Sequence, residues 1–163
     1  MATVRQEDFI QSIADALQHI SYYHPLDYIH ALAEAYEREQ GPAAKDAIAQ
    51  ILTNSRMCAE GHRPICQDTG IVVVFLEVGM NVRWEATLSV QEMVDEGVRR
   101  AYLLPENVLR ASIVADPAFA RRNTRDNTPA VVHVEIVPGD TIDVKLAAKG
   151  GGDGVACESN VCR

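Results

Sequence analysis

The hydrophobic pattern of the chain changes its period near residue 60, and this change limits the folds that are open to it. Before that point, apolar residues recur every three or four positions, as they do along one face of an α-helix. After it, residues 71–78 form a continuous β-branched and aromatic run closed by Gly79, which predicts a strand buried on both faces. Helices followed by strands favour an α+β fold over a parallel doubly wound sheet.

The first third of the chain predicts three helices. The first carries its apolar stripe over residues 9–20, and the second begins near Pro25, because proline suits the first turn of a helix. Gly41-Pro42 ends the second helix, and a third follows with apolar residues between 43 and 52. The predicted fold is therefore a set of N-terminal helices packed on a small, mainly antiparallel sheet.

Strand pairing is predicted from the turns that separate the later apolar runs. The 71–78 strand is expected to pair with residues 82–84, just beyond Gly79. Two more strands, at residues 130–137 and 141–148, flank Pro138-Gly139-Asp140, which is a tight connection. We therefore expect these two strands to form an antiparallel hairpin.

One more helix and one loop are predicted between the strands. Ser89 and Glu92 have the spacing of a capping box, which indicates the start of a helix that carries apolar residues from 90 to 102. The polar stretch 121–127 is expected to be a loop.

Composition excludes several classes of partner. The 163 residues fit one domain, and the net charge of −8 repels a phosphate backbone, so no nucleic-acid partner is expected. No apolar run reaches the roughly 18 residues of a membrane span, and the N-terminus lacks a signal peptide's apolar core, so no membrane contact and a cytoplasmic location are expected. The four cysteines are then better interpreted as free, metal-binding or catalytic than as two disulfides.

A polar segment between the third helix and the first long strand could carry chemistry. Cys66, Gln67, Asp68 and Thr69 are consecutive there, so a soft metal ligand stands beside groups that can hydrogen-bond an oxygen-rich substrate. A structural turn explains the same residues about as well, because Gly70 is a turn residue and a cysteine is often only buried.

Two further features could bind an anion. The run Lys149-Gly150-Gly151-Gly152 allows backbone N–H groups to converge on negative charge, although glycine runs are more often flexible loops. Arg110 could clamp a carboxylate with two hydrogen bonds, although a single arginine is usually a solvated surface charge.

Four segments occur in a fixed order along the chain: Ser55 to Gly70 (SRMCAEGHRPICQDTG), Glu96 to Tyr102 (EGVRRAY), Asn123 to Ala130 (NTRDNTPA), and Ala148 to Gly152 (AKGGG). Together they look like successive landmarks of class I, iron-sulfur-dependent fumarate hydratases. The resemblance covers roughly residues 1–152, and the CQDTG signature in this context is its most specific part.

The resemblance implies a cofactor, a reaction and a set of site residues. In that family three cysteines hold a 4Fe-4S cluster, and Cys66 resembles the first of them. Asp68 is implied to help move a proton, and the groups implied to contact a small dicarboxylate substrate are Gln67, Asp68, Arg110 and the backbone at Gly152. The implied activity is the reversible hydration of fumarate to (S)-malate by a full-length homodimer. The nearest alternative is another enzyme, the alpha subunit of L(+)-tartrate dehydratase. The non-enzymatic alternative is a folded fragment without activity.

The chain departs from the family pattern after Gly152. The family continues with Ser-Glu-Asn-Lys and a long segment that brings two further cluster cysteines, whereas residues 153–163 read DGVACESNVCR. Cys157 and Cys162 do not correspond to those ligands and are expected to be idle thiols. We therefore expect an N-terminal domain of a fumarase-like hydro-lyase at 1–152 and an atypical tail at 153–163, caused by truncation or an altered C-terminus. By itself, the chain is expected to be incomplete and to lack the cluster.

Overall fold

The computed structural model describes residues 2–150 and the backbone of residues 159–160. The chain forms two compact units, and each is described by itself: unit 1 is Met1–Ile20 with Gln67–Arg163, and unit 2 is Ser21–Cys66. The mixture of helices with small sheets confirms the α+β class. No helix among the described residues has the length and apolar character needed to cross a membrane.

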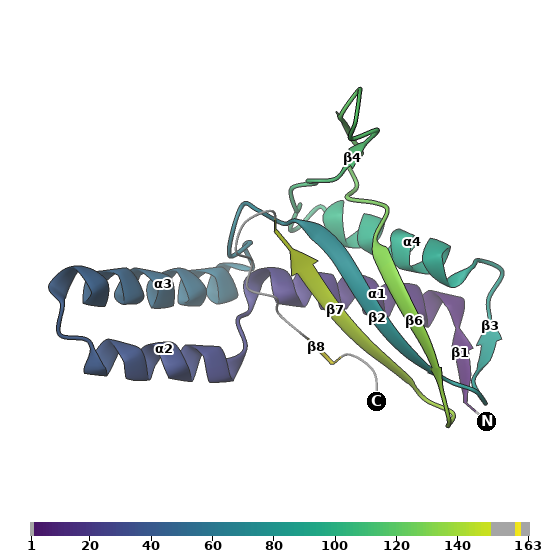
Figure 1. Cartoon of the computed structure of the whole chain (residues 1–163), viewed down its shortest axis with the longest axis horizontal. Helices are drawn as coiled ribbons and strands as arrows, with labels where there is room; N and C mark the ends of the chain where they lie inside the picture. Colours follow the sequence, from purple (N-terminus) through teal and green to yellow (C-terminus); the bar gives the residue numbers. More distant parts are fainter. Residues whose placement is uncertain (1, 151–158, 161–163) are drawn as a thin grey trace. The chain divides into compact units, whose positions relative to one another are not determined.

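Unit 1 contains a four-stranded sheet with the order β6-β2-β7-β8 (Figure 1). Its strands are β2 (Ile71–Gly79), β6 (Val131–Val137), β7 (Ile142–Lys149) and β8 (Ser159–Asn160). The central strand β2 runs parallel to β6 and antiparallel to β7, and β8 runs antiparallel to β7. The sheet is therefore mixed, with antiparallel pairing on one side of β2.

The expected hairpin between residues 130–137 and 141–148 is wrong, because β2 lies between β6 and β7. The connection Pro138-Gly139-Asp140 passes across the end of β2 instead of closing a tight turn. Backbone bonds hold it there: the N–H of Gly79 donates to the carbonyl of Thr141 at 2.8 Å, and the N–H of Met80 donates to that of Val137 at 2.8 Å. Strands β6 and β7 therefore each pair with β2 and not with each other.

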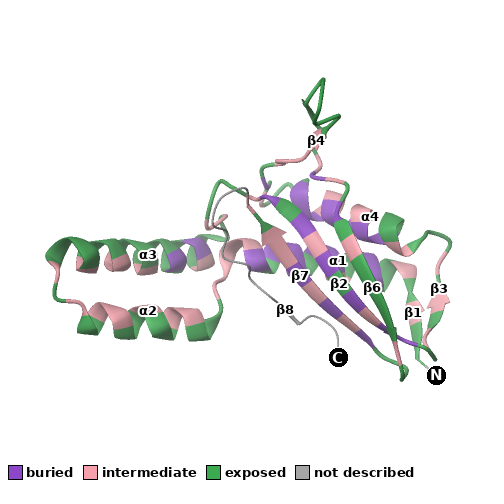
Figure 2. Cartoon of the chain, viewed as in Figure 1, coloured by how far each residue is buried: buried purple, intermediate pink, exposed green. Residues whose placement is uncertain are grey.

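Two helices form the core with one face of this sheet: α1 (Gln6–Tyr22) and α4 (Val90–Tyr102). In Figure 1 both lie on the same side of the strands. The side chains of Val72, Val74, Leu76 and Val78 are at most 6% exposed, whereas Ile71 and Phe75 on the other face are 45% and 47% exposed (Figure 2). The prediction that this strand is buried on both faces is therefore wrong, since helices cover one face.

Short strands complete unit 1. They are β1 (Thr3–Arg5), β3 (Arg83–Glu85), β4 (Val114–Ala115) and β5 (Arg122–Asn123). β3 pairs in parallel with β1, so the expected pairing of residues 82–84 with the 71–78 strand is wrong. The edge-to-face packing of Phe9 on Trp84, with ring centroids 5.3 Å apart, supplies an apolar reason for β3 to lie beside the start of α1.

The predicted capping box at the start of α4 is confirmed. The backbone N–H of Glu92 donates to the Ser89 hydroxyl, and the Glu92 carboxylate accepts from the Ser89 backbone N–H at 2.8 Å. The hydrogen bonds that the Glu92 carboxylate accepts from the Ser89 backbone N–H and hydroxyl lower the pKa of that carboxyl. They satisfy donors that the first turn of a helix would otherwise leave open, so the direction in which α4 enters the core is fixed.

Unit 2 is a hairpin of two helices, α2 (Leu26–Arg38) and α3 (Pro42–Gly61). Gly41 caps α3 and Pro42 occupies its first turn, so Gly41-Pro42 both separates the helices and begins the second of them. No residue of α2 is buried, and Ser55 and Cys58 are the buried residues of α3 (Figure 2). Of the three predicted N-terminal helices, α1 is the one whose side chains belong to the described core cluster.

Candidate active site

The start of β2 and the end of β7 approach each other very closely in unit 1. Gly70 has a φ of +62°, and a Cβ at this position would lie 2.0 Å from the carbonyl oxygen of Lys149. The next residue, Ile71, is in register with Lys149. Only glycine allows this contact, because any side chain would overlap the β7 backbone. The CQDTG segment and the lysine-glycine run, remote in sequence, are therefore adjacent.

Three of the predicted site residues and Gly150 lie together around this contact. A Cβ added to Gly150 would be 2.8 Å from Oδ2 of Asp68, so the Asp68 carboxylate lies against the Gly150 backbone. The Nη1 of Arg110 donates to the carbonyl of Gln67 at 3.3 Å. The side chains of Gln67, Asp68 and Arg110 are exposed, so a small solute could reach them.

Thr69 joins the same two segments. Its hydroxyl donates to the carbonyl of Arg110 and lies 3.1 Å from the hydroxyl of Ser112. The phenol of Tyr102 donates to the carbonyl of Thr69 at 3.4 Å, and burial raises the pKa of Tyr102 to about 12. A phenol with that pKa stays protonated at neutral pH and remains a donor, so it supports the loop without supplying a charge.

Sequence reasoning missed Asn127, whose side chain links residues 112–113 to Gly70 by hydrogen bonds. Its side chain is completely buried. Oδ1 accepts hydrogen bonds from the backbone N–H of Ser112 at 2.7 Å and of Ile113 at 3.2 Å, while Nδ2 donates to the carbonyl of Gly70 at 3.1 Å. Its φ of +62° is a conformation that asparagine adopts more readily than most residues. The polar stretch 121–127 thus includes strand β5 and ends in a buried side chain.

Replacing Asn127 by Ala is expected to destabilise unit 1 by about 2–4 kcal/mol, because one buried and two half-buried backbone groups lose their partner. Urea unfolding followed by circular dichroism would measure the change. Asn123→Ala is the matched control: that side chain is exposed and donates to the carbonyl of Ala111 at 2.8 Å. We expect it to cost under about 1 kcal/mol. Equal losses in the two variants would contradict the role of Asn127 as the buried clamp.

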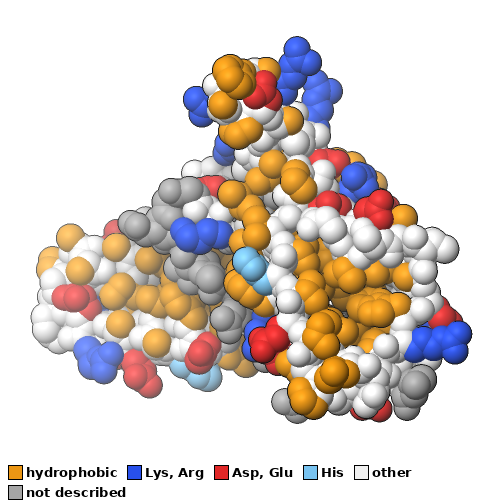
Figure 3. Space-filling model, turned by 45° about the vertical axis from the view of Figure 1, so that its right-hand side comes forward, with side chains coloured by type: hydrophobic (Ala, Val, Ile, Leu, Met, Phe, Trp, Pro, Cys, Tyr) orange, Lys and Arg blue, Asp and Glu red, His pale blue; other side chains and the backbone are white. Residues whose placement is uncertain are grey.

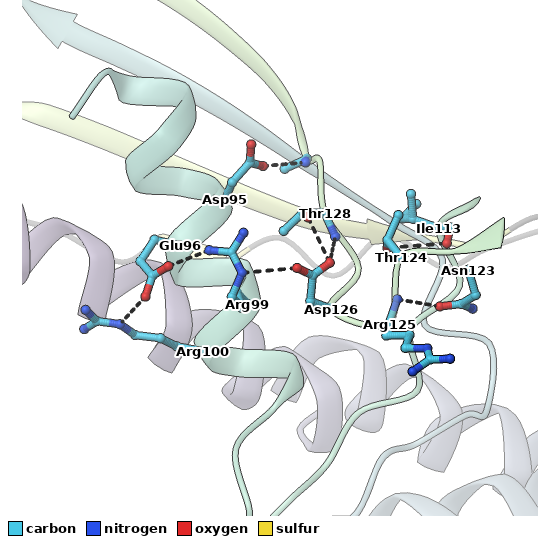
Figure 4. A network of polar contacts seen from close by, with 11 residues as sticks. Asp95, Glu96, Arg99, Arg100, Ile113, Asn123, Thr124, Arg125, Asp126 and Thr128 are labelled. Atoms are coloured by element: carbon cyan, nitrogen blue, oxygen red, sulfur yellow. Dashed lines mark hydrogen bonds and ion pairs between the residues drawn. The ribbon is translucent and has the colours of Figure 1, made fainter. Parts of the chain in front are cut away.

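Ion pairs connect α4 to the loop that ends at Asn127 (Figure 4). Nε of Arg99 lies 3.1 Å from Asp126, and Nη1 of the same guanidinium lies 2.5 Å from Glu96. Glu96 also pairs with Arg100 at 3.2 Å. Asp126 in turn accepts hydrogen bonds from the backbone and hydroxyl of Thr128 at 3.1 and 2.9 Å. The EGVRRAY and NTRDNTPA segments are thus joined by structural contacts.

Acid is expected to loosen this connection. Partial burial alone would raise the pKa of the Asp126 carboxyl, but the bonds from Thr128 and Arg99 outweigh it and lower that pKa below its ordinary value. A lowered carboxyl pKa contributes stability that is present at neutral pH and is lost as the pH falls below about 4. In Asp126→Asn, the free energy of unfolding should therefore fall less steeply with acid below pH 4 than in the unmodified chain. Urea titrations at successive pH values would measure both slopes, and identical slopes would contradict the assignment.

Cys66, the expected metal ligand, is exposed and is the last residue of unit 2, directly before Gln67 in the chain. Within unit 2 the segment that leads to it is fixed, because the N–H of Ile65 donates to the carbonyl of Ser21 at 2.8 Å and the Asn54 amide donates to that of Ile65 at 3.1 Å. Cys58 is buried, and burial raises the pKa of its thiol, which suits a packing role.

Other predicted residues lie outside the described part of the chain: Gly152, Cys157 and Cys162. Among the described residues, no three or more His, Cys, Asp or Glu side chains are grouped closely enough to hold a metal ion. A cluster of the expected type is bound by several cysteine thiolates. Cys66 alone among the described residues does not supply that set.

Comparisons with known proteins identify the family. The sequence model described as fumarate hydratase (Fumerase) matches residues 10–161. The chain is 32% identical to a putative L(+)-tartrate dehydratase subunit alpha of Methanocaldococcus jannaschii over 71% of the chain and 39% of that protein. It is 31% identical to the anaerobic class I fumarate hydratase of Escherichia coli over 72% of the chain and 21% of that protein. It is 29% identical to a putative class I fumarate hydratase of Geobacillus stearothermophilus over 90% of the chain and 28% of that protein.

The chain thus aligns with well under half the length of these relatives, and the resemblance implied by the ordered segments is confirmed at the level of the family. The relatives named as fumarate hydratases and the one named as a tartrate dehydratase subunit are all lyases that add or remove water. The chain belongs to the fumarate hydratase (Fumerase) family of hydro-lyases.

Proposed function

We propose that the chain is the N-terminal part of an iron-sulfur hydro-lyase that hydrates fumarate reversibly to (S)-malate. The observation that carries this proposal is the meeting of Gln67, Asp68, Arg110 and the Gly150 backbone in unit 1. Cys66 precedes them directly in the chain. The Arg110 guanidinium is the positive charge at this place, and it suits one carboxylate of a small dianion.

Each residue has a task in this proposal. The Arg110 guanidinium neutralises one carboxylate of the substrate, since its planar donors match a carboxylate. Gln67 and the backbone of the glycine run, including Gly152, orient the rest of the molecule. Asp68 helps to transfer the proton, because removal of water from malate needs a base for the C–H proton as well as an activated hydroxyl.

The proposed cofactor is a 4Fe-4S cluster with Cys66 as one ligand. When bound, such a cluster supplies a Lewis acid that polarises the hydroxyl of the substrate. The described residues provide one of the required thiolates, so the remaining ligands must come from outside them. For the whole protein we also propose a homodimer and a cytoplasmic location.

The second candidate function is that of an L(+)-tartrate dehydratase alpha subunit. It is favoured by the share of the Methanocaldococcus jannaschii relative that the chain covers, 39%, against 21% for the anaerobic Escherichia coli fumarate hydratase. The two candidates differ in their substrate. Assays of the whole protein with fumarate, (S)-malate and L(+)-tartrate, with and without a candidate beta subunit, would separate them. A folded protein with no turnover of any of the three would support the non-catalytic alternative.

The 163-residue chain by itself is expected to fold but neither to hold a stable 4Fe-4S cluster nor to form malate. The resemblance assigns only Cys66 of this chain to the cluster, and such a cluster needs further thiolates. Anaerobic reconstitution with iron and sulfide, followed by iron analysis, visible absorption and a malate assay, would test this. Binding of close to four irons per chain with fumarate hydration would contradict the expectation and make the tail functional. Sequencing the gene beyond codon 152 would show whether an in-frame or frameshifted continuation of the family sequence follows.

A further inference from the structure

Arg110 lies where the chain leaves the body of unit 1. The segment that follows it carries β4 and β5, and Figure 3 shows this segment standing out from the surface around it, as does Figure 1. Leu109, directly before Arg110, is 5% exposed and belongs to the core. Residues beside a projecting loop have few packing contacts, so the position of Arg110 depends on the hydrogen bonds of its own backbone.

A closed ring of hydrogen bonds surrounds the backbone at Arg110. The N–H of Leu109 donates to the carbonyl of Tyr102 at 3.3 Å, and the Thr69 hydroxyl donates to the carbonyl of Arg110. The phenol of Tyr102 donates to the carbonyl of Thr69 at 3.4 Å and completes the ring. Tyr102 is 2% exposed and is the last residue of α4, so the ring attaches both loop segments to the core.

The acceptors in this ring fix the direction of the hydroxyl protons. A carbonyl oxygen can only accept, so the single proton of the Thr69 hydroxyl points to Arg110. The Ser112 hydroxyl lies 3.1 Å from that of Thr69 and therefore donates to it. Thr69 is thus a donor to residue 110 and an acceptor from residue 112, and a side chain without a hydroxyl would lose both bonds.

We propose that Thr69 is a positioning residue that holds Arg110 where its guanidinium can neutralise one carboxylate of the substrate. This inference rests on the proposed function. The guanidinium is held as well, by the 3.3 Å bond from Nη1 to the carbonyl of Gln67. That bond uses one N–H of the guanidinium, so the side chain can still donate twice to a carboxylate. With its backbone and its guanidinium both tied to residues 67–69, Arg110 is preorganised for the substrate.

The Thr69 hydroxyl is better suited to this task than to holding the fold. The Thr69 side chain is half-buried, whereas a fully buried side chain, that of Asn127, supports the same loop through the carbonyl of Gly70. Loss of the hydroxyl leaves the bonds from Asn127 and from the phenol of Tyr102 in place. Unit 1 should therefore stay folded while the backbone of Arg110 loses its bond to Thr69.

Thr69→Val tests this role, because valine has nearly the shape of threonine without the hydroxyl. Arg110 is proposed to bind a carboxylate that is present in the ground state and in the transition state alike. In the whole protein, the KM for fumarate should therefore rise about tenfold while kcat changes by less than about twofold. Thr69→Ser keeps the hydroxyl and should return KM close to the unmodified value.

Thr124→Val is the matched control. The same substitution there removes a hydroxyl that donates to the carbonyl of Ile113 at 3.4 Å, outside the ring around Arg110. KM and kcat should both stay unchanged. Circular dichroism would first establish that every variant is folded.

A second measurement needs neither the cluster nor the substrate. In the 163-residue chain, NMR relaxation of the nitrogen spins at the backbone N–H and at Nε of Arg110 reports fast motion of this residue. Thr69→Val should increase that motion, and Thr69→Ser and Thr124→Val should not.

A raised KM with unchanged kcat, restored by serine and accompanied by added motion at Arg110, would support the proposal. Unmodified KM and unmodified relaxation in Thr69→Val would overturn it and leave the proposed hydratase intact. A loss of kcat alone would also overturn it, because Thr69 would then act in the chemical step. A whole protein that hydrates no fumarate would instead contradict the proposed function, and unmodified relaxation in Thr69→Val would then overturn the positioning role as well.

Discussion

Replacing Cys66 by Ser in the whole protein is expected to abolish both the iron-sulfur cluster and the hydration of fumarate. A serine hydroxyl is a poor ligand for iron at neutral pH, because the thiolate is the species that binds and a hydroxyl stays protonated. Loss of even an outer hydrogen-bond partner of a metal ligand costs about 10–100-fold in affinity or activity, so loss of the ligand itself should cost more than about 100-fold. Iron and sulfide content and the rate of malate formation, both measured anaerobically, would test this.

Cys58 provides the matched control. Its Sγ is buried and lies 3.7 Å from Oδ1 of Asn54 and 3.6 Å from the carbonyl of Pro64, so its one S–H can donate to either, as can a serine hydroxyl. Cys58→Ser should therefore keep the iron and most of the activity. If Cys66→Ser retained the cluster while Cys58→Ser lost it, the ligand would be misassigned. If both variants kept normal iron and activity, the proposal of an iron-sulfur site at this segment would fail.

The local elements of the fold are predicted well from the sequence, because they depend on short-range patterns. The apolar stripe over residues 9–20 lies within α1, and the three long strands begin and end within one residue of their predicted bounds. The Ser89–Glu92 capping box is a short-range hydrogen-bond pattern, so it too could be predicted.

The partners of these elements could not be predicted in the same way. The runs at 130–137 and 141–148 are separated by a turn that suits a hairpin, yet β2 lies between them. Strand spacing is about 4.8 Å, so a short connection can span one intervening strand as well as join two neighbours. The sequence pattern does not distinguish these cases. The open face of β2 is marked only by Glu77, since Ile71 and Phe75 on that face are as apolar as the residues of the core face.

The candidate site shows the same division between local and long-range information. The Cys66–Gly70 segment and Arg110 stand out by their residue chemistry and gain their roles from the family resemblance, and the structure brings Gln67, Asp68 and Arg110 together in unit 1. Their roles remain predictions. Asn127 was missed because a polar residue in a polar stretch normally faces water, and only the fold shows that its side chain is buried and which backbone groups it serves.

Gly70→Ala is expected to have the largest effect on stability of any substitution proposed for unit 1. The added methyl would lie 2.0 Å from the carbonyl oxygen of Lys149 and 2.5 Å from the N–H nitrogen of Gly150, and neither backbone atom can move without opening the β2–β7 pair. The φ of +62° adds strain for any residue with a Cβ. Together the overlap and the strain should destabilise the unit by about 3–5 kcal/mol.

Gly139→Ala separates the two causes. Gly139 also has a positive φ, +126°, but a Cβ there would meet nothing within 4 Å, so this variant carries the backbone strain without the overlap. It should cost about 1–3 kcal/mol. The excess loss in Gly70→Ala, measured by urea unfolding, then reports the close approach of the two chain segments. Because that approach is what brings Asp68 beside Gly150, a Gly70→Ala protein no less stable than Gly139→Ala would remove the structural basis of the proposed dicarboxylate site as well as the prediction itself.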